Sequence, residues 1–270
     1  MISGKAKIAG VIGWPVSHSL SPRLHQYWLR ENGIDGAYVP LVVTPDNLGD
    51  AIRALPKLGF RGINLTIPHK EAVMTFCDEI DATAKKIGAV NTLIIENGRI
   101  AGANTDAYGF MENVRPRLQG KAKAVVLGAG GAARAVCHAL TEAGFKEIVV
   151  TNRTLEKAQS LATEKIAVAP WEERSTILER ADLLVNTTSL GMTGKEALEI
   201  DLSALPKTAL VTDIVYKPLM PPLLEKAKAR GNPVVDGLGM LIYQAVPGFE
   251  AWFGVRPAVT EELRQYLLHG

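Results

Sequence analysis

The sequence predicts a two-domain α/β protein that joins a mixed-sheet α/β domain to a domain built on a parallel sheet. Strand-like apolar segments alternate with amphipathic helical segments along almost all of the 270 residues. A hairpin signal in the first third requires antiparallel strands there. From Lys123 onward the strands become continuously apolar, which is typical of a parallel sheet covered on both faces. We expect residues 1–105 to form the first domain, 106–239 to form the second, and the helices of 240–270 to complete the first.

The elements of the first domain follow from hydrophobic periodicity and turn residues. Asn97-Gly98 predicts a type I′ hairpin turn, because both central residues of that turn need a positive φ. The strands expected before it cover residues 7–13, 37–43 and 62–66, and the helices expected between them cover 22–31 and 45–58.

The second domain is expected to alternate strands and helices. Its last helical pattern begins near Leu238 and is polar at Gln244, which favours a helix that returns to the first domain. The expected strands lie in the segments "AVVLGAG", "EIVVTNR", "DLLVNTT", "ALVTDIV" and "NPVVDGL".

The stretch "INLTIPHK" places an amide, a hydroxyl and an ammonium group near the end of one predicted strand. Ile63 and Leu65 alternate with Asn64 and Thr66, as on a short strand with one apolar face. Pro68 ends the ladder, and His69 and Lys70 follow it. Lys70 is a candidate for stabilising and protonating an oxygen that gains charge in a reaction. A surface lysine at the start of a helix is the alternative.

The segment "VVLGAGGAARA" has the spacing of a phosphate-binding turn. Gly128, Gly130 and Ala133 match G-x-G-x-x-A directly after a strand and at the start of a helix. The two glycines permit a tight turn and close approach of a pyrophosphate to the helix N-terminus. The match predicts a Rossmann-type dinucleotide-binding domain, with a plain strand-to-helix turn as the alternative.

The end of the next strand, "TNRTLEK", indicates which dinucleotide binds. An NAD site usually carries an acid there, whereas this chain has Asn152, Arg153 and Thr154, with Lys157 one helical turn later. An arginine fork can pair with the 2′-phosphate of NADP, so we expect NADP rather than NAD. Otherwise Arg153 is a solvated charge and Thr154 a helix cap.

Two further groups of polar residues are candidates for the substrate site. Ser21 before Pro22 is typical of a helix N-cap. The hydroxyls of Ser19 and Ser21 then either bind a small carboxylate at the helix N-terminus or serve only in capping. Asp106, at the expected domain junction, is a candidate partner of Lys70. Burial lowers the pKa of a lysine, whereas a nearby carboxylate raises it. The sequence therefore does not decide the direction in which the pKa of Lys70 is shifted.

Composition argues against several classes of protein. The formal charge of +2 and the lack of basic blocks indicate no nucleic-acid partner, and no apolar run is long enough to span a membrane. The N-terminus reads as a strand rather than a signal peptide, and two cysteines suit reduced thiols in the cytoplasm. The histidines lack ligand spacing, so no metal is expected. Whether the chain is a monomer or a homodimer is left open.

These stretches together resemble the shikimate dehydrogenase family over nearly the whole chain. The matching motifs are "PVSHSLSP", "NLTIPHK", "GAVNTL", "NTD", "GAGGAARA", "NRT", "NTTSLGM", "DIVYKPL" and "GLGMLIYQA". The family reduces 3-dehydroshikimate to shikimate with NADPH on the chorismate route to aromatic amino acids. The order and spacing of the motifs carry the resemblance, because each motif alone is short.

The resemblance implies roles for residues at matching positions. Lys70 and Asp106 would be the catalytic pair. The substrate would contact Ser19, Ser21, Asn64, Thr66, Asn91, Tyr216 and Gln244. The NADP(H) cofactor would contact Gly128, Gly130, Gly131, Ala132, Asn152, Arg153, Thr154, Lys157, Thr188, Ser189, Met192, Gly239 and Met240.

Three alternatives and three departures accompany the resemblance. A quinate/shikimate or aminoshikimate dehydrogenase that uses NAD is the closest alternative. A non-catalytic metabolite sensor is another, although the chain keeps both Lys70 and Asp106. Folate-linked dehydrogenases share the architecture but do not explain "HSLSP". Gln26, Ala107 and Pro221 depart from the residues common in the family, and only Ala107 adjoins a proposed catalytic residue.

Overall fold

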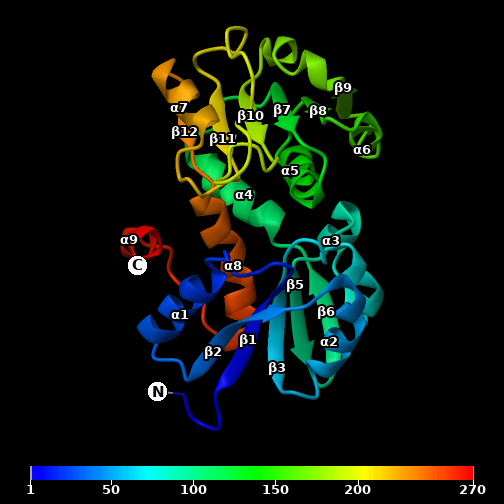
Figure 1. Ribbon diagram of the computed structural model, residues 1–270, viewed down its shortest axis with the longest axis vertical. Coiled ribbons are helices and arrows are strands. Elements are labelled where there is room, and N and C mark those ends of the chain that lie inside the picture. Colours follow the sequence, from blue (N-terminus) through cyan, green and yellow to red (C-terminus); the bar gives the residue numbers. More distant parts are fainter. Residues whose placement is uncertain (1, 270) are drawn as a thin grey trace. The chain divides into compact units, whose positions relative to one another are not determined.

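The computed structural model describes residues 2–269 (Figure 1). They divide into two compact units. Unit 1 comprises the chain up to Thr105 and the segment from Ile242 onward, and unit 2 comprises Asp106–Leu241. The second division falls inside the long helix α8 (Leu238–Phe253), which therefore contributes residues to both units.

Unit 1 contains a mixed six-stranded sheet in the order β2-β1-β3-β5-β6-β4. The pairs β2–β1 and β1–β3 are parallel, and β3–β5 and β5–β6 are antiparallel. The predicted hairpin is confirmed, since Asn97 and Gly98 have φ of 50° and 78° between β5 and β6. The strands are β1 (Lys7–Gly13), β2 (Gly36–Val42), β3 (Phe60–Leu65), β4 (Glu79–Ile80), β5 (Thr92–Glu96) and β6 (Arg99–Ala103).

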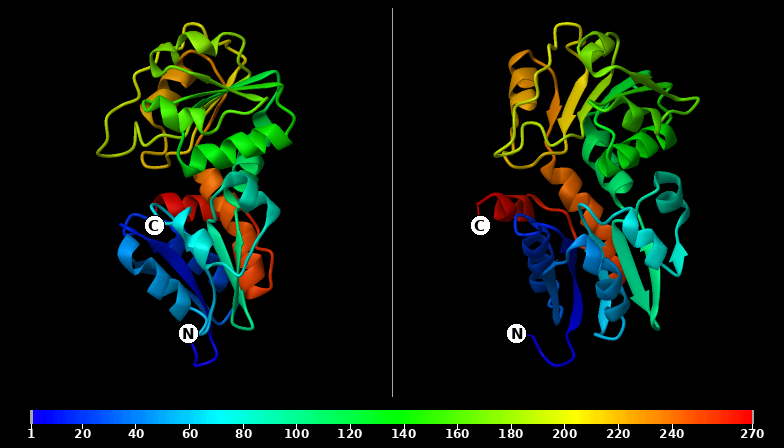
Figure 2. Two further views of the ribbon diagram at one scale, coloured as in Figure 1. Left: turned by 90° about the vertical axis from the view of Figure 1, so that its right-hand side faces the viewer. Right: turned by 45° about the vertical axis from the view of Figure 1, so that its right-hand side comes forward.

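The two faces of this sheet have different chemistry. Ile63 and Leu65 of β3 join an apolar core with α2 (Leu48–Ala54) and α3 (Ala82–Ile87), as their alternation predicts. The intervening Asn64 points to the opposite face. There the indole of Trp252 in α8 donates a hydrogen bond to the carbonyl of Leu93 at 2.9 Å. Figure 2 shows α8, in orange, lying along the sheet.

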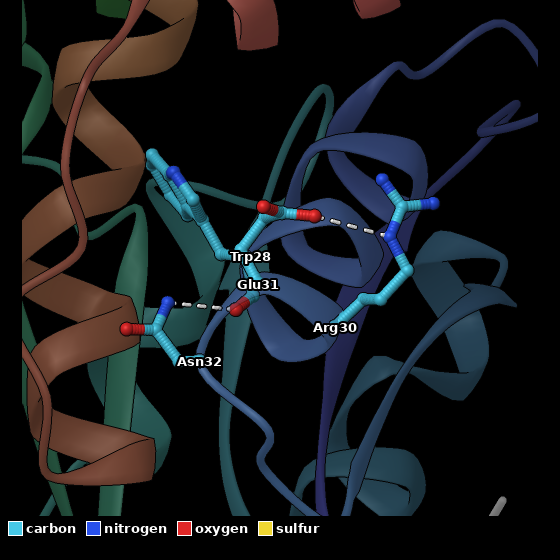
Figure 3. A network of polar contacts seen from close by, with 4 residues as sticks. All are labelled: Trp28, Arg30, Glu31 and Asn32. Atoms are coloured by element: carbon cyan, nitrogen blue, oxygen red, sulfur yellow. Dashed lines mark hydrogen bonds and ion pairs between the residues drawn. The ribbon is translucent and has the colours of Figure 1, made fainter.

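Helices α1 (Ser21–Glu31) and α9 (Glu261–His269) also belong to unit 1. The C-terminal end of α1 is closed by Asn32, whose amide donates to the carbonyl of Trp28 at 2.8 Å, while Arg30 pairs with Glu31 at 3.2 Å (Figure 3). The same Trp28 carbonyl also accepts from the backbone N–H of Asn32 at 3.0 Å, so the backbone and the side chain of Asn32 both bind the last turn of the helix.

One predicted helix is shorter than expected. The pattern over 45–58 predicted a continuous helix, but the structure has a 3-10 turn at Pro45–Asn47 and then α2, which ends at Ala54. Pro56 explains the early end, because proline lacks the N–H that would continue the helix. The short strand β4 was also not predicted from the sequence.

Unit 2 contains a parallel six-stranded sheet in the order β12-β11-β10-β7-β8-β9. All five predicted strands are present, and β9 (Ile166–Ala169) adds an edge that the sequence did not predict. The others are β7 (Lys123–Leu127), β8 (Glu147–Thr151), β10 (Leu183–Asn186), β11 (Leu210–Asp213) and β12 (Val234–Val235). The helices, seen on both sides of the sheet in Figure 2, are α4 (Asp106–Val114), α5 (Gly131–Glu142), α6 (Leu155–Gln159) and α7 (Pro222–Ala229). No helix among residues 2–269 is long and apolar enough to cross a bilayer.

Candidate active site

A buried polar network crosses the sheet of unit 1 on the face opposite its aliphatic core. The hydroxyl of Tyr38 on β2 donates to Oδ1 of Asn64 on β3 at 2.6 Å. The Asn64 amide nitrogen donates to Oγ1 of Thr92 at 3.1 Å and to the carbonyl of Asn91 at 3.2 Å. The amide protons of Asn64 are therefore directed into the protein, and its Oδ1 retains a lone pair for a ligand hydroxyl.

Asn91 is the centre of this network. Its Oδ1 accepts from the backbone N–H of Thr105 at 2.8 Å and from the hydroxyl of Thr92 at 2.9 Å. Its amide nitrogen donates to Thr105 Oγ1 at 3.0 Å and to Gln244 Oε1 at 3.3 Å. All four residues are buried. Hydrogen bonds in such a dry environment fix side-chain orientation, so the network holds its members in one arrangement.

Lys70 and Asp106 are both attached to this network through the backbone. The carbonyl of half-buried Lys70 accepts from the N–H of Val90 at 2.8 Å, next to Asn91 in the chain. Asp106 directly follows Thr105 and is itself buried as the first residue of α4. A carboxylate in the first helical turn is stabilised by the positive end of the helix dipole. Asn91 therefore fixes the chain beside each candidate catalytic residue.

The structure changes the role predicted for Ser21. Helix α1 begins at Ser21, so Leu20 rather than Ser21 occupies the N-cap position, and Ser21 does not cap the helix. Instead, the Ser21 N–H donates to Oγ of Ser19 at 3.2 Å, and the Ser21 hydroxyl bonds Tyr38. The expectation that Ser21 is the cap was wrong, because buried Leu20 extends the turn by one residue. Half-buried Thr66 follows β3 beside this region.

His25 supports Tyr38 from the side of α1. The two rings are stacked with centroids 3.9 Å apart and planes 1° apart. His25 is fully buried, and the loss of solvation lowers its pKa to about 3, so its ring is neutral at physiological pH. Burial likewise raises the pKa of Tyr38 well above its usual range, which keeps the hydroxyl protonated as a donor.

Sequence reasoning missed Tyr38, Thr92 and Thr105. The hairpin carries a signal for Thr105. A turn at Asn97-Gly98 pairs Thr92 with Ala103, so Asn91 and Asn104 lie at the same end of the ladder. Thr105 is the next residue after Asn104 and therefore lies close to Asn91. No comparable local signal exists for Tyr38. Its position next to Asn64 depends on β1 lying between β2 and β3.

The predicted glycine turn of unit 2 has the conformation that the spacing requires. Gly128 has a φ of +109°, and a Cβ there would overlap Oγ1 of Thr187. Gly130 occupies the N-cap position of α5, and Ala133 is fully buried behind the turn. A Cβ at Gly130 or Gly131 would meet no atom within 4 Å. The N-terminus of α5 is therefore open to a ligand, and the residues fit a dinucleotide pyrophosphate.

A cavity of about 210 Å³ lies beside this turn. Asn152 and Arg153 border it at the end of β8, and the Asn152 amide donates to the carbonyl of Thr154 at 2.9 Å. This bond fixes the loop that presents the exposed guanidinium of Arg153. The complete lining is Gly128, Ala129, Gly130, Asn152, Arg153, Trp171, Thr187, Thr188, Ser189 and Leu190. Six of these were predicted cofactor residues, and Trp171 was not.

A second network holds the loop at the end of β10. The Thr188 N–H and hydroxyl both bond Oδ1 of Asn186, at 3.0 and 2.7 Å. The Asn186 amide donates in turn to Oδ2 of Asp213 at 2.9 Å, and the Val215 N–H donates to Oδ1 at 2.9 Å. Burial raises the pKa of Asp213 to about 7, despite these two hydrogen bonds.

The other predicted cofactor and substrate residues of unit 2 lie outside this cavity lining. Gly239 has a packing explanation, because a Cβ there would overlap Oδ1 of Asn113 in α4. Thr154 is the N-cap residue of α6, but its hydroxyl makes no capping bond. The remaining ones are Gly131, Ala132, Lys157, Met192, Tyr216 and Met240. Among the described residues, no group of three His, Cys, Asp or Glu side chains forms a metal site.

Together, the parallel sheet, the glycine turn and the open helix N-terminus define a dinucleotide-binding protein of the dehydrogenase class. Three family models match the chain: the shikimate dehydrogenase substrate binding domain over residues 11–93, shikimate / quinate 5-dehydrogenase over 112–215, and the shikimate 5'-dehydrogenase C-terminal domain over 237–265. The chain belongs to the shikimate dehydrogenase family.

Relatives and solved structures agree with this assignment. The chain is 57% identical to shikimate dehydrogenase (NADP(+)) of Paramagnetospirillum magneticum, over 99% of this chain and 100% of the relative. Shikimate 5-dehydrogenase from Thermus thermophilus, solved with NADP(H) and shikimate, superposes with a TM-score of 0.88 at 38% identity, covering 97% and 98% of the chains. Quinate dehydrogenase from Corynebacterium glutamicum, solved with NAD, has a TM-score of 0.91 at 31% identity, covering 97% and 99%.

Proposed function

We propose that this protein catalyses the reversible, NADPH-dependent reduction of 3-dehydroshikimate to shikimate. The observation that carries the proposal is the Asn91 network, which fixes the chain beside both Lys70 and Asp106. The near-full-length identity to curated NADP-dependent shikimate dehydrogenases supports the reaction and the cofactor. It also disfavours quinate with NAD as the main pair of substrates.

The residues around the unit 2 cavity suit NADP(H). The open N-terminus of α5 receives the pyrophosphate, and Arg153 with Asn152 receives the 2′-phosphate. When bound, the cofactor supplies or accepts the hydride at C3 of the substrate. The loop of Thr188 and Ser189, held through Asn186, borders the nicotinamide end.

The residues of unit 1 bind the substrate and move the proton. The hydroxyls of Ser19 and Ser21 receive the carboxylate, with the Ser21 hydroxyl exchanging its bond to Tyr38 for one to the ligand, while Asn64 accepts from a ring hydroxyl through its remaining lone pair. Lys70 gives its proton to the C3 oxygen during reduction and takes it back in the reverse direction. Asp106 accepts a hydrogen bond from a substrate hydroxyl and so orients the ring.

Reduced-nicotinamide absorbance with shikimate and NADP as the only substrates tests this assignment. We expect a steady rise in absorbance that requires both compounds, and a much smaller kcat/KM with quinate and NAD. A larger kcat/KM for quinate with NAD would overturn the choice within the family. Ligand binding without turnover of either pair would indicate a metabolite sensor instead.

The proposal also covers the partners, the oligomeric state and the cellular compartment of the enzyme. The near-neutral charge supports an enzyme that acts on small molecules without a nucleic-acid partner, and the enzyme is either a monomer or a homodimer. Burial raises the pKa of the Cys77 thiol to about 11 and that of Cys137 to about 12, so both stay protonated and poorly reactive. Such thiols are typical of a reducing cytoplasm. Light scattering after size exclusion measures the oligomeric state.

A further inference from the structure

Trp171 follows β9 at the edge of the parallel sheet. Strand β9 pairs in parallel with β8, so the carboxyl ends of both strands meet at the same edge. The end of β8 carries Asn152 and Arg153, and the end of β9 leads through Pro170 to Trp171. All three residues border the cavity described above.

Trp171 is the aromatic residue in the lining of this cavity. The other lining residues are glycine, alanine, small polar residues, Arg153 and Leu190. An indole offers a wide, flat, polarisable surface, which suits a planar aromatic ligand group better than a phosphate or a sugar.

The indole is held in place by Arg174. The guanidinium lies over the ring, 5.1 Å from its centroid, and donates to the Trp171 carbonyl at 3.0 Å. The same guanidinium donates through Nε to the carbonyl of Glu199 at 2.7 Å. With Arg174 over one face, the ring meets a ligand through its other face or its edge. A ring fixed in advance loses little conformational entropy when a ligand binds.

The geometry of the nucleotide determines which of its chemical groups lies next to Trp171. If the pyrophosphate lies at the N-terminus of α5 and the 2′-phosphate at Arg153, the adenosine ribose lies over the end of β8. The base attached to that ribose extends along the sheet edge toward β9. We propose that Trp171 forms the adenine subsite of the cofactor by stacking on the base. This inference rests on the proposed use of NADP(H) and adds a residue that contacts it.

Fluorescence gives a readout of Trp171 that does not depend on catalysis. The chain has four tryptophans, and Trp171 is the one in unit 2, whereas Trp14, Trp28 and Trp252 lie in unit 1. The probe is adenosine 2′,5′-bisphosphate, which carries the base and the 2′-phosphate without nicotinamide. We expect it to quench emission of the full-length protein, and we expect Trp171→Phe to abolish that quenching while calorimetric affinity falls less than about threefold.

Trp171→Ala separates stacking from simple proximity. Base–aromatic stacking contributes about 1–3 kcal/mol by alanine substitution, which corresponds to about a fivefold to hundredfold loss of affinity. We expect KM for NADP to rise by about tenfold or more, with KM for shikimate unchanged. Trp14→Ala, which removes an exposed indole from unit 1, is the matched control and should change neither constant.

The outcomes distinguish this inference from the proposed reaction. Unchanged affinity in both Trp171 variants, or quenching that persists in Trp171→Phe, would overturn the adenine subsite even if shikimate turnover is normal. If adenosine 2′,5′-bisphosphate binding depends on Trp171 but shikimate is not oxidised, the subsite stands and the proposed substrate fails. Trp171 also packs against the core of unit 2, so Trp171→Leu, which keeps an apolar side chain but has no aromatic face, replaces Trp171→Ala in this test if the Ala variant does not fold.

Discussion

At the scale of single residues, the role that we propose for Lys70 is the most specific one. Its carbonyl accepts from the N–H of Val90, the residue before Asn91, and the residue as a whole is half-buried. A proton donor held in this way contributes typically a hundredfold or more to the rate of a reaction. The other lysines near it in the sequence, such as Lys85 in α3, are exposed and have no comparable setting.

We predict that Lys70→Ala lowers kcat by at least about a hundredfold while shikimate still binds, because the proton donor is lost and the serine and asparagine contacts remain. Steady-state kinetics and calorimetry measure the two effects. Lys85→Ala removes the same charge from an exposed helix and serves as the control. Turnover of Lys70→Ala near that of the unmodified enzyme would exclude Lys70 from proton transfer.

Arg153 is the residue that we expect to bind the 2′-phosphate of NADP. It borders the unit 2 cavity at the end of β8, where an NAD-specific site usually carries an acid. We predict that Arg153→Ala raises KM for NADP far more than KM for NAD, because NAD lacks the 2′-phosphate. Lys146→Ala changes the charge equally at the opposite end of β8 and should affect neither KM. An equal loss for both cofactors would contradict the assignment.

At the scale of elements, the substrate site that we propose in unit 1 depends on the order of its strands. Asn64 and Thr92 are direct partners on β3 and β5, so their side chains share one face of the sheet. Tyr38 reaches Asn64 from β2 across β1, and α1 contributes both the His25 ring and the Ser21 hydroxyl. Four elements therefore determine the direction in which one asparagine amide points.

This arrangement makes Tyr38 a positioning residue. We predict that Tyr38→Phe keeps the stack on His25 but raises KM for shikimate by about three- to thirtyfold, the scale of one or two lost buried hydrogen bonds. KM for NADP should stay the same, since the change lies in unit 1. Tyr27→Phe, on the outer face of α1 against Tyr266, is the matched control. A rise of both KM values together with a lower melting temperature would indicate a purely structural role.

At the scale of the whole molecule, stability depends on pH through groups that are buried in an uncharged form. Asp213 has a pKa of about 7 in the folded chain and an ordinary value near 3.8 when unfolded. The folded state therefore binds more protons between these values. The stability contributed by its protonated form is complete below about pH 4 and is lost as pH rises to about 7. His25, with a pKa of about 3, acts in the opposite direction and costs stability as pH falls below about 6.5.

We predict that Asp213→Asn flattens the fall in unfolding free energy between pH 5 and pH 8, with a change on the order of a few kcal/mol. Urea unfolding at a series of pH values measures the slope. Asp46→Asn removes an exposed carboxylate and should leave the slope unchanged. Identical slopes in Asp213→Asn and the unmodified protein would show that Asp213 is already ionised in the folded state at neutral pH.

The sequence by itself determined the features that are encoded within a few neighbouring residues. The Asn97-Gly98 turn, the alternation around Asn64, the glycine turn at Gly128 and the five apolar strands of unit 2 are all present in the structure. Backbone conformation and local periodicity produce these features, so short motifs suffice to predict them. The early end of α2 was not predicted although Pro56 lies just beyond it, and β9 was not predicted because it has only four residues.

The tertiary structure alone decided which distant residues share an environment. Tyr38 meets Asn64 because β1 lies between their strands, and Trp171 joins Arg153 because β9 adds to the edge of β8. The pKa of Asp213 rises to about 7 because the neighbouring chain removes water from the carboxyl group. Strand order and desolvation are properties of the packed chain, and no local run of amino acids specifies them.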